Sequence, residues 1–223
     1  MGTQPMKTAV ALLTYNRQAL FIRTLNSLYN AGHPFRMAIY DNGSTDGTAE
    51  IVKSIGGEVN TSDNHTTGHG MNAVVSKTME SKPDIILFTA DDFEYRQDWL
   101  LKLISFWENA PQDIIMASCY LEPDWDWNKI SETGDAGEHY AIRDSIPGSN
   151  WSFRARDIDK IFPVREATGG EDLEICRRLR NDGYKLAALD LVKHIGEQDS
   201  AWGNESWRYA KPLDMSALGF ETW

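Results

Sequence analysis

Cysteine is one of the scarcest residues in this 223-residue chain, which contains only Cys119 and Cys176. The two are far apart and form no Cys-x-x-Cys pattern, so we expect packed thiols in a reducing compartment. No hydrophobic run approaches the roughly 18 residues that a membrane-spanning helix needs. Met1–Lys7 also lacks the charged-then-apolar pattern of a signal peptide. We therefore expect a cytoplasmic protein with no integral membrane segment.

Positive charge is also in short supply, with 22 Lys and Arg against 33 Asp and Glu and a formal net charge of -11. An acidic surface repels phosphate backbones, which disfavours nonspecific binding to nucleic acids or anionic membranes. The balance still leaves room for one small basic pocket that faces a diphosphate. With 41% hydrophobic residues the chain can bury a sizeable core, and its length fits one large α/β domain.

Short hydrophobic runs alternate with helical periodicity, a pattern typical of βαβ units around a mostly parallel sheet. The clearest central strand is Asp84–Thr89 (DIILFT). The other expected strands are Thr8–Leu13, Arg36–Asp41, a weak one near Gly57–Asn60, Asp113–Cys119, Gly148–Ala155 and Lys185–Leu189. The expected helices are Gln18–Ala31, a segment carrying Ile51, Val52 and Ile55, one from about Gly70, Asp98–Ala110 and Glu171–Asn181.

Two segments show no periodicity. Glu122 to about Pro147 is rich in Trp, Asp, Gly and Glu, which predicts a long loop or lid. Gly196–Trp223 is a polar, aromatic and irregular tail, whose tryptophans would cover a cleft or form a partner surface. No internal repeat or low-complexity linker divides the chain. The prediction is a single α/β domain over residues 1–223.

Polar side chains follow three of the predicted strands: Thr14–Arg17, Asp41–Ser44 and Ala90–Glu94. Each segment alone is explained by turn chemistry or helix capping. Ligands of parallel α/β sheets, however, bind beyond the carboxyl ends of the strands, where these segments would meet. Adjacent carboxylates such as Asp91 and Asp92 are costly unless a cation or a proton compensates them. The sequence therefore predicts a site for Mg²⁺ or Mn²⁺ that bridges to phosphates.

Four motifs, TAVALLTYNR, IYDNGSTDGT, DIILFTADDFE and GGEDLEICRRLRNDGYKL, occur in this order. They resemble the successive motifs of family 2 glycosyltransferases, over about residues 7–195. The resemblance implies the GT-A fold, a Rossmann-like, mostly parallel sheet flanked by helices. It also implies transfer of a sugar from a nucleotide-sugar donor to an acceptor hydroxyl with inversion. The nucleotide-binding half would span about residues 7–120, and the acceptor and catalytic half about 121–195.

The resemblance also implies which residues bind the nucleotide. Asp41 occupies the place where the family recognises base and ribose, and Asp91 would contact the ribose. The remaining expected contacts are Thr14, Asn16, Arg17, Gly68, His69 and Asn72. UDP is the favoured donor nucleotide because it is the commonest in the family.

The expected metal ligands are Asp92, in the family's Asp-x-Asp segment, and His194, after the last strand. A surface or core position explains His194 equally well. This sequence departs from the motif, since Ala90 stands where the first Asp would be. An alternative is that Asp92-Phe93-Glu94 acts as an Asp-x-Glu motif.

Asp172 matches the general base of the family, which takes the proton of the acceptor hydroxyl. Without the resemblance, Asp172 and Glu171 would be interpreted as first-turn acids that favour a helix start. Glu171 and Trp151 are expected on the acceptor side, where Trp151 would stack on a sugar ring. A tryptophan at this point of a strand is equally often part of the core.

Other functions compete with sugar transfer. Gly68–Ala73 fits a Gly-x-Gly-x-x-Ala dinucleotide motif with Asp91 about 20 residues on, which would indicate an NAD-dependent oxidoreductase. The preceding polar stretch, Asn60–Thr67, argues against that reading. Ala90 favours a weakly active or non-catalytic nucleotide-sugar-binding module. For an enzyme, the acceptor is a glycan, a lipid or a small molecule, and a modified DNA base is less favoured by the acidic charge. The sequence leaves homo-oligomerisation open.

Overall fold

The structure, a computed structural model, describes residues 6–121 and 130–195. The expected tail at 196–223 and the first part of the expected loop, 122–129, lie outside the described residues.

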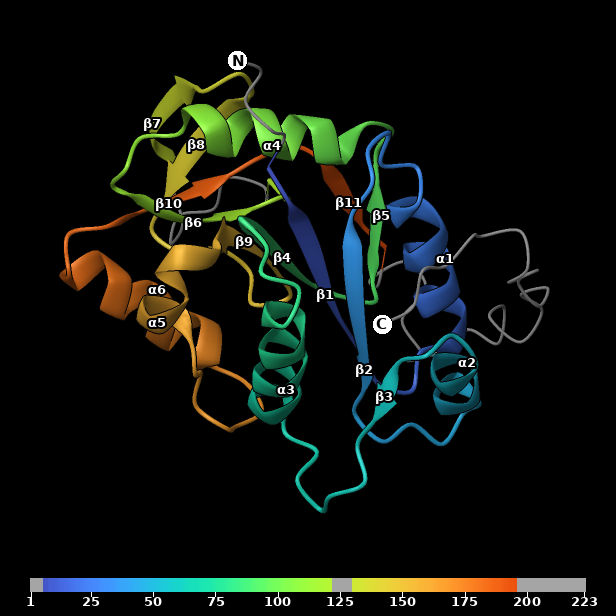
Figure 1. The fold of residues 1–223 in the computed structure, drawn as a ribbon. Coiled ribbons are helices and arrows are strands. Elements are labelled where there is room, and N and C mark those ends of the chain that lie inside the picture. The colour runs from blue at the N-terminus through green and yellow to red at the C-terminus, as the bar shows by residue number, and fades with distance from the viewer. Residues whose placement is uncertain (1–5, 122–129, 196–223) are drawn as a thin grey trace.

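A nine-stranded sheet runs through the molecule in the order β3-β2-β1-β4-β9-β6-β10-β8-β7 (Figure 1). Strands β3, β2, β1 and β4 are parallel neighbours, and β6 pairs in parallel with β10. Strand β9 is antiparallel to both β4 and β6, and β8 is antiparallel to β7 and β10. The strands are β1 (Thr8–Thr14), β2 (Arg36–Asp41), β3 (Glu58–Val59), β4 (Ile85–Ala90), β6 (Ile114–Ser118), β7 (Ile130–Asp135), β8 (His139–Arg143), β9 (Asn150–Arg154) and β10 (Lys185–Ala188). The predicted mostly parallel α/β sheet is confirmed.

Helices cover both faces of the sheet, as Figure 1 shows for α1 and α2 on one side and α3, α5 and α6 on the other. Helices α1, α2 and α4 pack into one hydrophobic core, and α3, α5 and α6 pack into a second. The helices are α1 (Gln18–Leu28), α2 (Thr48–Ser54), α3 (Thr67–Met79), α4 (Trp99–Asn109), α5 (Ile158–Ile161) and α6 (Glu171–Asn181). A short 3-10 helix, Ala155–Asp157, leads into α5.

Strand β1 explains how one short sequence serves both cores. Its side chains alternate across the sheet, so Val10 and Leu12 enter the first core while Ala11 and Leu13 enter the second. All seven residues of β1 are buried. A strand covered on both faces is continuously hydrophobic instead of alternating, as TAVALL is. Beyond its carboxyl end the chain becomes exposed at Tyr15 and Asn16, where the polar segment continues.

The expected loop at Glu122–Pro147 is a wrong prediction in its described part, because β7 and β8 form an antiparallel hairpin at the edge of the sheet. β7 is exposed along most of its length, so it carries no hydrophobic alternation that periodicity would detect. A second sheet, also unexpected, pairs β5 (Phe93–Tyr95) with β11 (Val192–His194) in antiparallel orientation. α3 begins three residues before the expected position.

No helix within residues 6–121 and 130–195 has both the length and the apolar character that crossing a bilayer requires.

Arg154 holds the end of α4 against the sheet from a buried position on β9. Its guanidinium donates to the carbonyl oxygens of Trp107, Ala110 and Ile114 at 3.3, 2.8 and 3.3 Å. It also lies 4.8 Å from the centre of the Trp107 ring. We expect Arg154→Met to lower the free energy of unfolding by about 2–4 kcal/mol, because three buried carbonyls lose their donor. Denaturant titration measures this loss.

The matched control is Arg156→Met, two residues along the chain. Arg156 is mostly exposed and pairs with Asp157 at 3.7 Å, so its replacement should change stability by no more than about 0.5 kcal/mol. Equal losses for the two variants would show that the carbonyl contacts of Arg154 contribute nothing special.

Candidate active site

The three polar segments that follow strands of the sheet meet, as predicted. They lie at the carboxyl ends of β2, β1 and β4, and this end of the sheet is called the functional edge below. In the register of the sheet, Thr14 lies opposite Asp41, and Leu13 lies opposite Ala90. The ends of β2, β1 and β4 are therefore direct neighbours. The Asn42 amide also donates to the Thr14 carbonyl oxygen at 2.9 Å, which continues the pairing beyond β2.

Asp41 is fully buried at the end of β2, and its side chain closes the following turn. Its Oδ1 accepts from the amides of Gly43 and Ser44 at 2.9 and 2.7 Å, and Gly43 takes a φ of +93°. A left-handed φ of this kind is readily available only to glycine. Oδ2 of Asp41 is buried and has no partner among the described residues. This oxygen is an unused acceptor beside the ends of β1 and β2.

Thr14 and Asn16 build the frame of this edge. The Thr14 hydroxyl donates to Asp91 Oδ2 at 2.6 Å, which orients that carboxyl group. The Asn16 amide donates to Ser44 Oγ at 2.7 Å, and its side-chain Oδ1 accepts from the Thr45 amide at 2.8 Å. Both residues therefore connect the loops after β1, β2 and β4. Their expected contacts with a nucleotide remain part of the proposal below.

Two adjacent carboxyl groups, Asp91 and Asp92, are buried at the end of β4 and share one cation, Arg17. Arg17 Nη1 lies 2.7 Å from Asp92 Oδ2 and 3.4 Å from Asp91 Oδ1. Burial raises the pKa of Asp91 to about 7, against the lowering effect of the Arg17 charge. Burial acts in the same direction on Asp92, but the hydrogen bond from His194 and the charge of Arg17 outweigh it and lower its pKa.

The small second sheet brings His194 to this edge. β11 pairs with β5, which directly follows the acidic pair, and the Ile195 amide donates to the Asp92 carbonyl oxygen at 2.8 Å. His194 Nε2 consequently lies 3.4 Å from Asp92 Oδ2. Glu94, the last residue of the alternative Asp-x-Glu motif, instead points to Arg23 at 3.6 Å and is about half-exposed. The structure therefore favours Asp92 with His194 over Asp92 with Glu94.

The donor set at this position fits a divalent cation. Asp92 Oδ1 is buried and has no partner among the described residues, so one carboxylate oxygen is available beside the His194 imidazole. Within residues 6–121 and 130–195 no cluster of three or more Asp, Glu, His or Cys side chains suits a metal ion. Mg²⁺ and Mn²⁺ commonly take one or two protein ligands and complete their coordination with phosphate oxygens and water. A two-ligand site of this kind suits a cation that arrives with a diphosphate.

Asp172 comes from a different part of the chain and lies beside the same edge. It is the second residue of α6, and its Oδ2 accepts from the Gly148 amide at 3.3 Å. The next residue, Ser149, accepts from the Ala90 amide at 2.7 Å through its carbonyl oxygen. One short loop therefore links Asp172 to the end of β4. The loop takes this position because β9 runs antiparallel to β4 and begins at its carboxyl end.

Trp151 does not serve as a platform for a sugar ring, and this expectation is wrong. Its side chain is 0% exposed, and its ring packs against Phe88 and Phe162 in the second core. The reason is β-strand alternation, which turns Trp151 towards α5 and α6. Glu171 is also buried, but its Oε2 has no partner among the described residues. An unpaired buried carboxylate oxygen next to Asp172 leaves the acceptor-side prediction for Glu171 standing.

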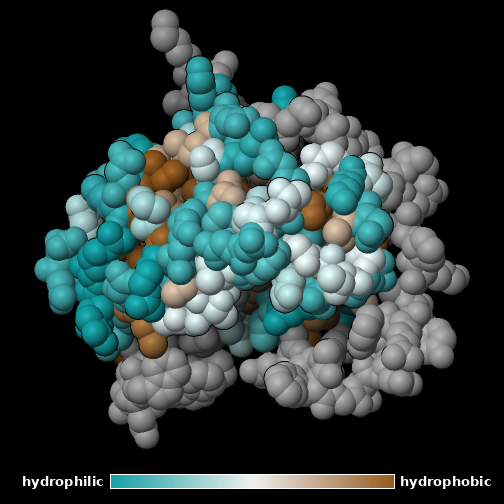
Figure 2. All heavy atoms as spheres, turned by 90° about the horizontal axis from the view of Figure 1, so that it is seen from below, coloured by the Kyte–Doolittle hydropathy of each residue, from teal (hydrophilic) through white to brown (hydrophobic). Residues whose placement is uncertain are grey.

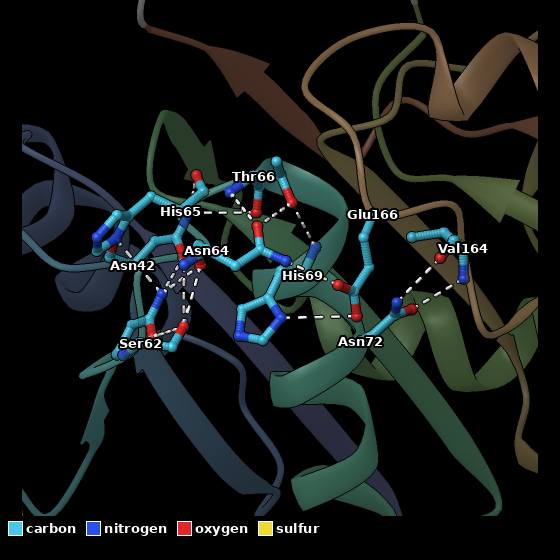
Figure 3. Close-up of polar contacts among 10 residues, drawn as sticks. Asn42, Ser62, Asn64, His65, Thr66, His69, Asn72, Val164 and Glu166 are labelled. Atoms are coloured by element: carbon cyan, nitrogen blue, oxygen red, sulfur yellow. Dashed lines mark hydrogen bonds and ion pairs between the residues drawn. The ribbon is translucent and has the colours of Figure 1, made fainter.

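Residues of the expected nucleotide segment Gly68–Asn72 contact the chain that leads to α6, as Figure 3 shows for His69 with Glu166 and for Asn72 with Val164. Both ends of the Asn72 amide pair with the Val164 backbone, at 2.9 and 2.8 Å. The Gly68 amide donates to the Ala167 carbonyl oxygen at 3.0 Å, and a Cβ on Gly68 would lie 2.0 Å from the Arg165 carbonyl oxygen. Asn72 and Gly68 are therefore structural residues, not nucleotide contacts. The contacts of Gly68 and Asn72 also argue against the dinucleotide-binding interpretation of Gly68–Ala73.

A network of polar residues, most of which sequence reasoning missed, joins this segment to the end of β2 (Figure 3). The Asn42 side chain donates to the His65 carbonyl oxygen at 2.8 Å, and Asn64 Nδ2 donates to Glu166 Oε2 at 2.7 Å. His69 Nδ1 lies 3.6 Å from Glu166 Oε1. Asn42 lies in the predicted segment Asp41–Ser44, but Asn64 and Glu166 show no periodicity, so no sequence signal pointed to them. Together they hold the chain before α6 close to the loops after β2 and β3.

The face that contains these loops is predominantly polar. Figure 2 looks at the molecule from below the view of Figure 1, where the loop between β3 and α3 lies. Hydrophilic and intermediate residues make up most of the visible described surface, and hydrophobic residues appear in small separate areas. Such a surface suits a charged or hydroxylated ligand better than an apolar one.

Comparison of the sequence with models of protein families identifies the family of this chain. The model for glycosyl transferase family 2 matches residues 9–157, which is more than half of the chain and includes the ends of β1, β2 and β4. This chain is a family 2 glycosyltransferase. No curated protein matched the sequence. Asp172 and His194 lie beyond the residues that the family model matches, so their roles belong to the proposal below.

Solved structures of very different sequence share the GT-A fold of this glycosyltransferase. The mannosyltransferase PcManGT from Pyrobaculum calidifontis, in complex with GDP-Man and Mn²⁺, matches with a TM-score of 0.60 and 16% identity, over 83% of this chain and 57% of that one. TarS from S. aureus matches with 0.63 and 17%, over 85% and 37%. GalNAc-T7 with UDP, GalNAc and Mn²⁺ matches with 0.62 and 14%, over 85% and 44%. The chain thus spans between 37% and 57% of the lengths of these proteins.

Gly148 offers a test of how closely Asp172 must be placed in this glycosyltransferase. A Cβ on Gly148 would lie 2.8 Å from the Asp172 Cβ, a distance that forces one of the two residues to move. With Asp172 as the general base proposed below, we expect Gly148→Ala to reduce sugar transfer on the order of 10- to 100-fold, because a base displaced by about 1 Å loses its alignment. Nucleotide affinity and melting temperature, measured on the same sample, serve as controls. Full activity in the variant would show that this contact does not position Asp172.

Proposed function

We propose that this family 2 glycosyltransferase moves a sugar from a nucleoside diphosphate sugar, with a UDP-sugar favoured, to an acceptor hydroxyl with inversion at the sugar carbon. The observation that carries the proposal is the meeting of three groups at one sheet edge. These are the unpaired oxygen of Asp41, the Asp92–His194 pair and the carboxylate of Asp172. Each group would serve one step of the reaction: binding the nucleoside, neutralising the charge of the diphosphate, or accepting a proton.

The nucleoside end of the donor would bind at the carboxyl ends of β1 and β2. The unpaired Oδ2 of Asp41 would accept a hydrogen bond from an N–H or O–H group of the nucleoside, because Oδ1 already accepts from the amides of Gly43 and Ser44. Asp91, fixed by Thr14, would contact the ribose. A buried acceptor without a partner costs free energy, and a ligand hydrogen bond recovers that cost.

The diphosphate would lie at the end of β4, between Arg17 and the Asp92–His194 pair. Asp92 and His194 are the residues that would hold a Mn²⁺ or Mg²⁺ ion. When bound, such an ion neutralises the charge that develops on the leaving diphosphate. Arg17 brings a guanidinium fork that matches phosphate oxygens.

Asp172 would act as the general base. Its position at the start of α6, within hydrogen-bond distance of the Gly148 amide, places its carboxylate beside the edge that holds the donor. There it takes the proton of the acceptor hydroxyl while the oxygen attacks the sugar carbon from the side opposite the diphosphate. A single displacement of this kind inverts the configuration. Glu171, with a buried oxygen that lacks a partner, would orient the acceptor.

The test combines a donor screen with one substitution. Binding of UDP-, GDP- and dTDP-sugars is measured by calorimetry with Mn²⁺ present, and transfer or donor hydrolysis is followed for the donor that binds. We expect Asp172→Asn to lower the rate about 10²- to 10⁴-fold, because proton transfer by a positioned base contributes this much. Its donor affinity should stay within about threefold, since Asp172 lies outside the nucleotide pocket.

Asp182→Asn, the same exchange at the exposed end of α6, is the matched control and should retain wild-type activity. Near-normal turnover in Asp172→Asn would remove Asp172 as the base. A protein that binds donors but transfers no sugar would support the second candidate, a nucleotide-sugar-binding module, which Ala90 in place of the first Asp of the motif favours.

A further inference from the structure

Arg17 occupies an unusual position for a residue of a donor pocket. It stands at the start of α1, and its Nη1 lies 2.7 Å from Asp92 Oδ2, the same oxygen that His194 Nε2 approaches at 3.4 Å. It also reaches Asp91 at 3.4 Å. The two carboxyl groups are nearly fully buried, whereas the Arg17 side chain is 48% exposed. The charge of the buried acid pair is thus compensated by a guanidinium group whose side chain is about half-exposed.

The buried acid pair needs compensation for its negative charge, which Arg17 supplies in the free protein. Two adjacent buried carboxylates repel each other and lose their hydration, so Arg17 stabilises their charge when nothing else is bound. A divalent cation at the unpaired Oδ1 of Asp92 would bring further positive charge to the carboxylate whose Oδ2 already binds Arg17. Like charges that share one site at low dielectric constant repel strongly. One of the two must give way, and the exposed stem leaves Arg17 free to move.

We propose that Arg17 is an exchangeable counter-ion. It forms ion pairs with Asp91 and Asp92 in the free enzyme and moves to the donor diphosphate when the metal binds. This inference rests on the proposed function, because it requires a diphosphate beside the acid pair. The guanidinium exchanges a carboxylate partner for phosphate oxygens, which match its planar fork equally well. No bond is made or broken in the exchange, and only the ion-pair partner of Arg17 changes.

The exchange makes metal and nucleotide dependent on one another. Without a nucleotide, metal binding must displace Arg17 from Asp92 into water, which weakens the affinity for the metal. With a diphosphate present, the displaced guanidinium gains a new partner, so each ligand favours the other. Such mutual dependence is a coupling free energy between two sites and acts equally in both directions. Arg17 would therefore weaken the binding of either ligand alone and strengthen the binding of metal and nucleotide together.

The experiment measures Mn²⁺ binding by electron paramagnetic resonance of the free ion, with and without UDP, or GDP if the donor screen selects it. In Arg17→Gln we expect Mn²⁺ alone to bind roughly tenfold tighter, because it no longer displaces a charge-assisted hydrogen bond. The nucleotide with Mn²⁺ should bind roughly tenfold weaker, because the phosphate loses the same kind of bond. These opposite signs distinguish exchange from a structural role, which would weaken both. Arg17→Lys, which keeps the charge, should leave Mn²⁺ affinity within about threefold of wild type.

Arg23→Gln is the matched control. Arg23 also lies on α1 and pairs with an acid that follows β4, Glu94, but at 3.6 Å and with both side chains about half-exposed. It should leave both affinities unchanged. Weakening or no change of Mn²⁺ binding in Arg17→Gln overturns the counter-ion role. If no nucleotide binds to the wild type with Mn²⁺, the proposed function fails and the transfer to a diphosphate falls with it, whereas Mn²⁺ titration alone still decides the counter-ion role.

Discussion

The burial of two adjacent carboxyl groups at the end of β4 is the constraint around which the functional edge is organised. Asp91 and Asp92 are both more than nine-tenths buried. Carboxylates are stable there only with donors and cations around them. Thr14 and Arg17 from the end of β1, and His194 from β11, supply these contacts. The pairing of β5 with β11 places His194, from late in the chain, beside Asp92.

A second consequence of the fold is that the proposed donor-binding residues and the proposed base come from separate halves of the sequence and are joined by loops. The reversed strand β9 begins beside the end of β4, so the Gly148–Ser149 loop touches Ala90 on one side and Asp172 on the other. The Asn64–Glu166 and Asn72–Val164 contacts tie the chain before α6 to the loop after β3 and to α3. These loops are thus joined largely by backbone groups and asparagine side chains, with Glu166 as an acidic partner.

The sequence was sufficient wherever long periodic segments or family motifs carried the signal. The parallel strands, the helices α1, α4 and α6, and the convergence of Thr14, Asp41 and Asp92 were all predictable. Trp151 was misjudged because a strand residue faces either a ligand or the core, and one sequence does not show which. The strands β5 and β11 have three residues each, too short for periodicity. The partner of Asn72 lies 92 residues away along the chain, and that of Gly68 lies farther still, where local patterns carry no information.

The central claim is that Asp92 and His194 hold a cation next to the donor diphosphate. Anomalous scattering at the manganese edge, from crystals grown with Mn²⁺ and the nucleoside diphosphate that binds, tests it most directly. The account predicts one anomalous peak in contact with the Asp92 carboxylate, the His194 imidazole and the diphosphate oxygens. A nucleotide bound at the ends of β1 and β2 with manganese elsewhere, or with no peak at Asp92, would contradict it.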